Sequence, residues 1–113
     1  VIISSEKYIE NNPDKTKRFM KATARGYKFA INDPETAAEI LFKYTPESNP
    51  ELIKNSQQWL SPRYRSQAPY WGYQKHKVWK EFGNWMQKHD LIKNDFNAEA
   101  AFTNKYLPGK SEN

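Results

Sequence analysis

One short sequence motif occurs three times in this chain, and each copy predicts the start of a helix. In every copy an asparagine or aspartate precedes a proline, and the proline precedes an acidic residue. The first side chain suits the capping position, the proline suits the first helical position, and the acid complements the positive end of the helix dipole. We therefore expect three helix starts, at Asn12-Pro13-Asp14, Asp33-Pro34-Glu35 and Asn49-Pro50-Glu51.

Apolar spacing after each start predicts which side of the helix is buried. The first helix should bury Met20, Thr23, Ala24, Tyr27, Ala30 and Ile31. Its opposite side carries four cations, here named the basic stripe: Arg18, Lys21, Arg25 and Lys28. The second helix should end before Pro46 and bury Ala37, Ile40, Leu41 and Tyr44. The third should end before Pro62 and bury Leu52, Ile53, Trp59 and Leu60.

Beyond the third helix, residues 61–75 hold Pro62, Pro69 and Gly72 and predict a long irregular connection. A fourth helix is then expected, with one apolar face made of Val78, Trp79, Phe82, Trp85, Met86 and His89. Asp95-Phe96-Asn97 predicts the start of a fifth, in which Phe96 packs against Ala101. Residues 109–113 form a polar tail.

The first three residues, Val1-Ile2-Ile3, are β-branched without polar alternation, which is typical of a strand buried on both faces. Nothing else in the sequence predicts a strand that could pair with them, and an unpaired strand leaves its backbone groups unsatisfied. The segment therefore frays, pairs with another copy of the chain, or pairs with a sheet in sequence that precedes Val1. We favour the last interpretation, so the chain is expected to be a fragment.

Length and charge limit the functions that the chain can have. At 113 residues there is room for one domain, and 18 basic against 13 acidic residues give a net charge of +5. This charge permits contact with nucleic acid or an anionic membrane without requiring it. The chain has no cysteine, which excludes disulfides and thiolate metal sites.

No arrangement of residues typical of an enzyme is present. His76 and His89 stand thirteen positions apart without the spacing of a metal site, and the four glycines form no phosphate-binding loop. We therefore expect no catalytic residue, no metal and no cofactor. His89 is interpreted as a histidine near a helix end, and the basic stripe as a solvated helix face.

The stretch QAPYWGYQ, residues 67–74, crowds three aromatic side chains around one glycine. These rings either anchor an irregular connection to the core or shape a pocket for a ligand. We predict that they mainly pack, with Trp71 buried against the helices that carry Trp59 and Trp79. Tyr70, Trp71 and Gln74 remain the candidate ligand-binding residues.

Several blocks, taken in order, resemble the C-terminal third of a family of ABC-transporter substrate-binding proteins. The K-A-T-A-R-G-Y-K-F-A-I-N-D-P-E-T-A-A-E-I-L block is similar to importers of sulfonates, taurine and nitrate. The W-L-S-P and A-P-Y-W-G blocks are similar to the branch that binds pyrimidine precursors of thiamine. A W-x-x-F-x-x-W helix and a closing A-F-T-N-K-Y-L-P follow, so the resemblance covers residues 1–108.

This resemblance implies a mostly α-helical segment, of about five helices and one short N-terminal strand, within a two-lobed α/β type II periplasmic-binding fold. Val1-Ile2-Ile3 would be the strand by which the chain returns from the second lobe to the first. It also implies an extracytoplasmic location, a pyrimidine solute, an ABC permease as partner, and a lipid anchor outside this segment. The isolated chain should then self-associate. The alternatives are a basic α-helical module that binds nucleic acid and a helical protein-interaction domain, although the charge alone does not require nucleic acid.

Overall fold

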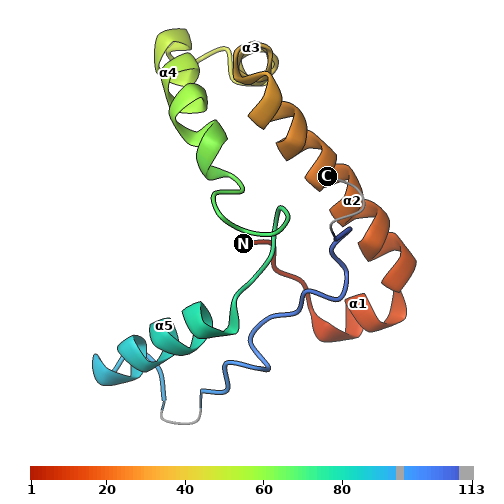
Figure 1. Cartoon of the computed structure of the whole chain (residues 1–113), viewed down its shortest axis with the longest axis vertical. Coiled ribbons are helices and arrows are strands. Elements are labelled where there is room, and N and C mark those ends of the chain that lie inside the picture. The colour runs from red at the N-terminus through yellow and green to blue at the C-terminus, as the bar shows by residue number, and fades with distance from the viewer. Residues whose placement is uncertain (94–95, 110–113) are drawn as a thin grey trace.

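The regular elements of this computed structural model, which describes residues 1–93 and 96–109, are all helices (Figure 1). They are α1 (Glu6–Asn11), α2 (Pro13–Asn32), α3 (Pro34–Tyr44), α4 (Pro50–Leu60), the 3-10 helix η1 (Ser61–Arg63) and α5 (His76–Lys88). The three helix starts predicted at Pro13, Pro34 and Pro50 are confirmed. The predicted ends before Pro46 and Pro62 are confirmed as well.

Two of the three predicted capping side chains cap their helices. Asp33 accepts a hydrogen bond from the backbone N–H of Thr36 at 3.0 Å, and Asn49 accepts one from Leu52 at 3.1 Å. Asn12 does not cap α2, because it also ends α1 and its side-chain amide donates to the Tyr8 carbonyl at 3.0 Å. Its proline and acid nevertheless start α2 at the predicted residue.

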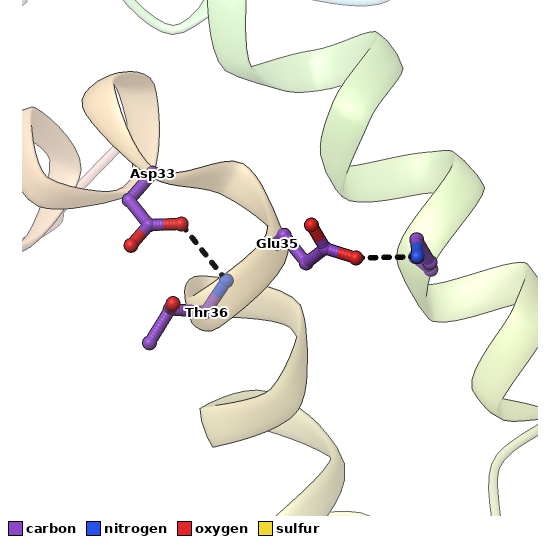
Figure 2. A network of polar contacts seen from close by, with 4 residues as sticks. Asp33, Glu35 and Thr36 are labelled. Atoms are coloured by element: carbon purple, nitrogen blue, oxygen red, sulfur yellow. Dashed lines mark hydrogen bonds and ion pairs between the residues drawn. The ribbon is translucent and has the colours of Figure 1, made fainter.

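Helix α3 contacts both α2 and α4, and the most buried residues of α2 and α3 are small. Ala24 of α2 and Ala38 of α3 are only 7% and 5% exposed. Glu35, in the first turn of α3, forms an ion pair of 2.5 Å with Lys54 of α4. Figure 2 shows this ion pair beside the Asp33 cap, so the start of α3 is fixed on two sides.

The chain as a whole is more open than a compact domain of its length. Its radius of gyration is 16.9 Å, whereas a compact domain of this size is expected to have about 13 Å. Its accessible surface of 8875 Å² also exceeds the roughly 6500 Å² expected for a folded monomer of this mass. Figure 1 shows α5 apart from the α2–α4 group, joined to it by irregular segments. Much of the apolar surface therefore stays in contact with solvent.

The predicted N-terminal strand is absent. Residues 1–5 lie in no strand, and Val1 and Ile3 are 90% and 87% exposed. No other described residue, in 1–93 or 96–109, forms a strand that could pair with them. Because strand backbone needs a neighbour for its hydrogen bonds, the β-branched run alone does not produce the element.

The predicted fifth helix is wrong, and one helix was not predicted. Residues 96–109 form turns and irregular structure, while Asp95 lies outside the described residues. The ring of Phe96 lies against Gly83 of α5 instead of packing on Ala101, which is exposed. The helix that sequence reasoning missed is α1, which Ser5 caps by accepting a hydrogen bond from the Tyr8 N–H at 3.2 Å. The tail residues 110–113 lie outside the described part of the chain.

The predicted faces are correct for α2 but only partly correct for the later helices. All six predicted α2 residues are buried or partly buried, and the basic stripe is exposed. In α3, α4 and α5 several large apolar side chains of the predicted faces stay in solvent. These exposed residues, all predicted to be buried, are Ile40, Leu41, Tyr44, Leu52, Trp59, Val78, Phe82 and Trp85. His89 is also exposed, and its ring lies 4.6 Å from that of Trp85.

Candidate functional site

The candidate ligand-binding residues lie in the connection between η1 and α5, whose backbone is shaped by two local contacts. Arg65 donates hydrogen bonds to the carbonyls of Ala68 at 3.2 Å and Pro69 at 2.9 Å. Gly72 has φ +85°, and a Cβ atom there would lie 2.9 Å from a methyl group of Leu107. Glycine therefore permits both the left-handed turn and the close approach of the C-terminal segment.

Trp71 packs against α2. Its ring stacks on that of Tyr27 at 4.5 Å and 23°, and Tyr64 meets Tyr27 edge-on at 4.9 Å. The prediction that Trp71 packs is therefore confirmed, but the predicted partner helices are wrong. Tyr27 presents a flat ring from the buried face of α2, whereas Trp59 points to solvent and Trp79 stacks on Phe102. Trp71 is partly buried rather than mostly buried.

Gln74 is held by structural hydrogen bonds. Its backbone N–H donates to the side-chain oxygen of Asn104, and the Asn104 amide donates back to the Gln74 carbonyl, both at 2.9 Å. Its side-chain oxygen accepts a hydrogen bond from the Trp79 indole at 3.0 Å. These contacts fix the end of the connection just before α5 begins.

A surface depression of about 340 Å³ lies beside this connection. It is lined by Arg65, Ser66, Gln67, Ala68, Tyr73, Gln74, Lys75 and Val78. Of the three sequence candidates, Gln74 is part of the lining, whereas Tyr70 and Trp71 are not. Tyr70 instead meets the ring of Tyr73 edge-on at 5.3 Å.

Sequence reasoning missed the two cations of this lining, Arg65 and Lys75. They stand at either side of the aromatic stretch, ten positions apart in the chain. A search for charges flanking the predicted connection would have found them. Ser66, next to Arg65, has the unusual φ of 50°. The lining therefore includes a backbone conformation that residues other than glycine rarely adopt.

A second depression, of about 310 Å³, lies where α5 meets the residues that follow it. Its lining includes His76, Lys80 and Glu99, and the His76 ring lies 3.9 Å from the Glu99 carboxylate. One acid and two basic groups therefore share this surface. Within the described residues, no group of three or more histidine, cysteine or acidic side chains could hold a metal ion.

The groups with displaced pKa values lie far from both depressions in the chain. The pKa of Asp33 is below its ordinary value of 3.8 because the Thr36 backbone and side chain donate hydrogen bonds to its carboxylate. The pKa of Lys54 is above its ordinary value of 10.5 because its ammonium donates a hydrogen bond to Glu35. Both shifts follow from contacts that stabilise helix ends, so they indicate structure rather than catalysis.

Comparison with known proteins confirms the resemblance to this group of substrate-binding proteins. Residues 1–37 match the family model described as NMT1/THI5 like. The chain is 28% identical to a formylaminopyrimidine-binding protein of Halalkalibacterium halodurans, over 91% of this chain and 32% of the relative. It is 25% identical to the riboflavin-binding protein RibY of Chloroflexus aurantiacus, over 97% of this chain and 33% of the relative.

Relatives with a different description also match. The 4-amino-5-hydroxymethyl-2-methylpyrimidine phosphate synthase THI5 of Saccharomyces cerevisiae is 23% identical, over 93% of this chain and 29% of that protein. The chain spans about a third of the length of these relatives. Relatives described as binding proteins and relatives described as synthases therefore share the same segment.

Proposed function

We propose that this chain is part of a solute-binding protein that captures a small heteroaromatic compound, a pyrimidine related to thiamine, for an ABC importer. The observation that carries the proposal is the similarity to a formylaminopyrimidine-binding protein over 91% of this chain. The riboflavin-binding relative supports the wider class, because a flavin is also a nitrogen heteroaromatic ring system. A pyrimidine is the specific ligand proposed.

The open shape of the chain supports a role as one part of a larger protein. Val1 and Ile3 are exposed in the chain by itself, and so are the α5 residues Val78, Phe82 and Trp85. We propose that further parts of a two-lobed binding protein cover these surfaces and complete the ligand cleft. The chain would then contribute one wall, and Val1-Ile2-Ile3 would become a strand when a sheet is present to pair with it.

The proposed partners and location follow from the same role. An importer's binding protein works outside the cytoplasm and delivers its solute to a permease, and a lipid anchor outside this segment would hold it at the membrane. No helix within residues 1–93 and 96–109 is long and apolar enough to cross a bilayer. The exposed basic stripe of α2 is a surface by which the protein would meet the permease or the membrane.

Calorimetry on the complete gene product tests the function directly. Formylaminopyrimidine is expected to give a saturable isotherm, whereas the 113-residue chain should give no heat above dilution. A wall without its cleft cannot bury the 70–90% of ligand surface, roughly, that small-molecule sites enclose. A micromolar isotherm with the 113-residue chain would instead place the site within it, at Tyr70, Trp71 and Gln74.

Other outcomes of this experiment separate the candidate ligands. Binding of riboflavin with no binding of the pyrimidine would move the ligand class to flavins. Binding of neither compound would contradict the proposed function. A shift of labelled DNA that weakens as salt increases would favour the nucleic-acid module instead.

The yeast relatives raise a second candidate, the synthesis of a pyrimidine phosphate. We propose a non-catalytic role, because the relatives described as binding proteins match with higher identity, at 28% and 25% against 23%. Mass spectrometry of the small molecules that the complete gene product releases tests this choice. Release of a pyrimidine phosphate would identify the protein as a synthase.

A further inference from the structure

The depression between Arg65 and Val78 combines two cations with no acidic side chain in its lining. The other lining groups are the polar Ser66, Gln67, Tyr73 and Gln74 and the apolar Ala68 and Val78. Uncompensated positive charge beside hydroxyl and amide donors is the arrangement that attracts a small oxyanion. The second depression differs because Glu99 lies in its lining.

Arg65 is held in place before any ligand arrives. Its Nε atom donates to the Ala68 carbonyl at 3.2 Å and its Nη2 atom to the Pro69 carbonyl at 2.9 Å. These two bonds use the Nε and Nη2 edge of the planar guanidinium. Neither of them involves the N–H groups of Nη1. A planar group fixed in this way loses little further freedom when it binds an oxyanion.

Lys75 supplies the second charge from a fixed point of the backbone. The preceding residue, Gln74, is held by its two hydrogen bonds to Asn104. The Lys75 ammonium has no ion-pair partner among the described residues, whereas nearby Lys77 lies 3.7 Å from Glu81. The acid that follows along α5 is thus occupied with a different lysine.

The remaining lining suits an uncharged ring attached to the anion. Val78 is 58% exposed and Tyr73 is 36% exposed, so both present apolar surface beside the charges. A volume of about 340 Å³ is at the lower end of the range for sites that bind small molecules. It exceeds the space that a single oxyanion needs.

We propose that this depression binds the oxyanion of a phosphate monoester whose ester group is a small ring. The inference deepens the proposed function and rests on it for the nature of the ring, a pyrimidine. Arg65 and Lys75 would contact the phosphate, and Tyr73 and Val78 would contact the ring. A dianion suits two cations better than a carboxylate does, which is why the phosphate is preferred.

An NMR titration of the 15N-labelled 113-residue chain tests the site, with phenyl phosphate, benzoate and benzyl alcohol as probes. Phenyl phosphate should shift the amide signals of Ser66, Gln67 and Lys75 with a saturable curve, and added salt should weaken it. Benzoate should bind more weakly, and benzyl alcohol should produce no saturable shift. Equal or tighter binding of benzoate would overturn the choice of phosphate.

Two matched variants separate a site from general attraction to a cationic protein. Lys75→Gln should weaken phenyl phosphate binding about threefold, the effect of one charge near a solvent-exposed anion. Lys43→Gln removes the same charge from the exposed last turn of α3 and should leave the affinity unchanged. Equal affinities for the two variants, or shifts outside the depression, would overturn the proposal.

The outcome is also distinguishable from failure of the proposed function. If the complete gene product binds formylaminopyrimidine while phenyl phosphate causes no shifts, the function stands and this site is rejected. If phenyl phosphate binds in a manner sensitive to Lys75→Gln while no pyrimidine binds, the anion site stands and the pyrimidine function is rejected.

Discussion

Helices α2 and α5 both carry an apolar face, but other parts of the chain cover the face of α2 more completely than that of α5. Tyr27 of α2 lies between Tyr64 and Trp71, and Ala24 is 7% exposed. On α5, Phe82 and Trp85 stack on each other at 6.1 Å while remaining 54% and 50% exposed. Amphipathic spacing therefore identifies a face that needs a partner without identifying where that partner is.

The largest expected effect comes from removing the ring that covers α2. Trp71→Ala should lower the free energy of unfolding by about 3 kcal/mol, because the loss of a large, partly buried ring leaves Tyr27 uncovered. Trp59→Ala is the control, since Trp59 is 60% exposed and contacts the Arg63 guanidinium. It should cost less than about 1 kcal/mol in chemical denaturation.

The opposite pattern would change the interpretation of QAPYWGYQ. Suppose that the Trp71→Ala variant of the chain unfolds like the parent chain. If the same substitution in the complete gene product lowers ligand affinity at an unchanged melting temperature, Trp71 binds ligand. The stacking on Tyr27 would then contribute little to stability.

The next effect concerns the hydroxyl that joins η1 to α2. Ser61 is 2% exposed, and its hydroxyl lies within donating distance of two carbonyls, that of Ala30 at 2.8 Å and that of Gln57 at 2.7 Å. It also accepts from the Gln57 side-chain amide at 2.9 Å. Ser61→Ala should cost about 2 kcal/mol, because it leaves buried polar groups without partners. Ser56→Ala, at an exposed position of α4, should change stability by less than about 0.5 kcal/mol. Equal losses in the two variants would show that this network contributes nothing specific.

A pH-dependent effect is expected from the cap of α3. Because folding lowers the pKa of Asp33 below 3.8, its contribution is present above that value and is lost as the pH falls through the folded pKa. Asp33→Asn keeps a capping side chain that does not titrate. The melting temperature of the parent chain should therefore fall more steeply than that of the variant below about pH 4. Parallel profiles would contradict this role for the carboxylate.

The exposed apolar residues of α5 should affect association more than stability. We expect the 113-residue chain to self-associate, and Phe82→Ser should shift its sedimentation profile toward monomer. The free energy of unfolding of the monomer should change by less than about 1 kcal/mol, because Phe82 is already 54% exposed. Ile3→Ser tests the other route, in which residues 1–3 pair between copies. If neither variant alters sedimentation, these surfaces do not drive association.

The smallest effect is expected on the basic stripe. Arg25 is exposed, so Arg25→Glu should change stability by no more than about 0.5 kcal/mol. Ala24→Glu, one residue away on the covered face, should be strongly destabilising because it buries a charge. A large loss from Arg25→Glu in the complete gene product would indicate that the stripe is covered there.

Features that depend on neighbouring residues in the chain could be predicted from the sequence. The starts of α2, α3 and α4 and the covered face of α2 depend on local capping, proline geometry and spacing. The strand at residues 1–3 and the burial of Phe82 and Trp85 depend on partners distant in sequence, and those predictions were wrong. The candidate site shows the same division. Its aromatic stretch was evident, but the lining formed by Arg65 and Lys75 depends on how the turn at Ser66 folds.

The hydrogen bonds between Gln74 and Asn104 also affect the order in which the chain can fold during its synthesis on the ribosome. The two residues are thirty positions apart and exchange two hydrogen bonds of 2.9 Å, while Leu107 packs over Gly72. During synthesis from the N-terminus, α2, α3 and α4 emerge with the contacts of α3 to both neighbours available, so they can dock early. Trp71 can reach Tyr27 of α2 early, but the contacts of Gly72 and Gln74 must wait until Asn104 and Leu107 have been translated. A nascent chain halted before Asn104 would thus leave residues 72–74 more accessible to proteases than they are in the finished chain.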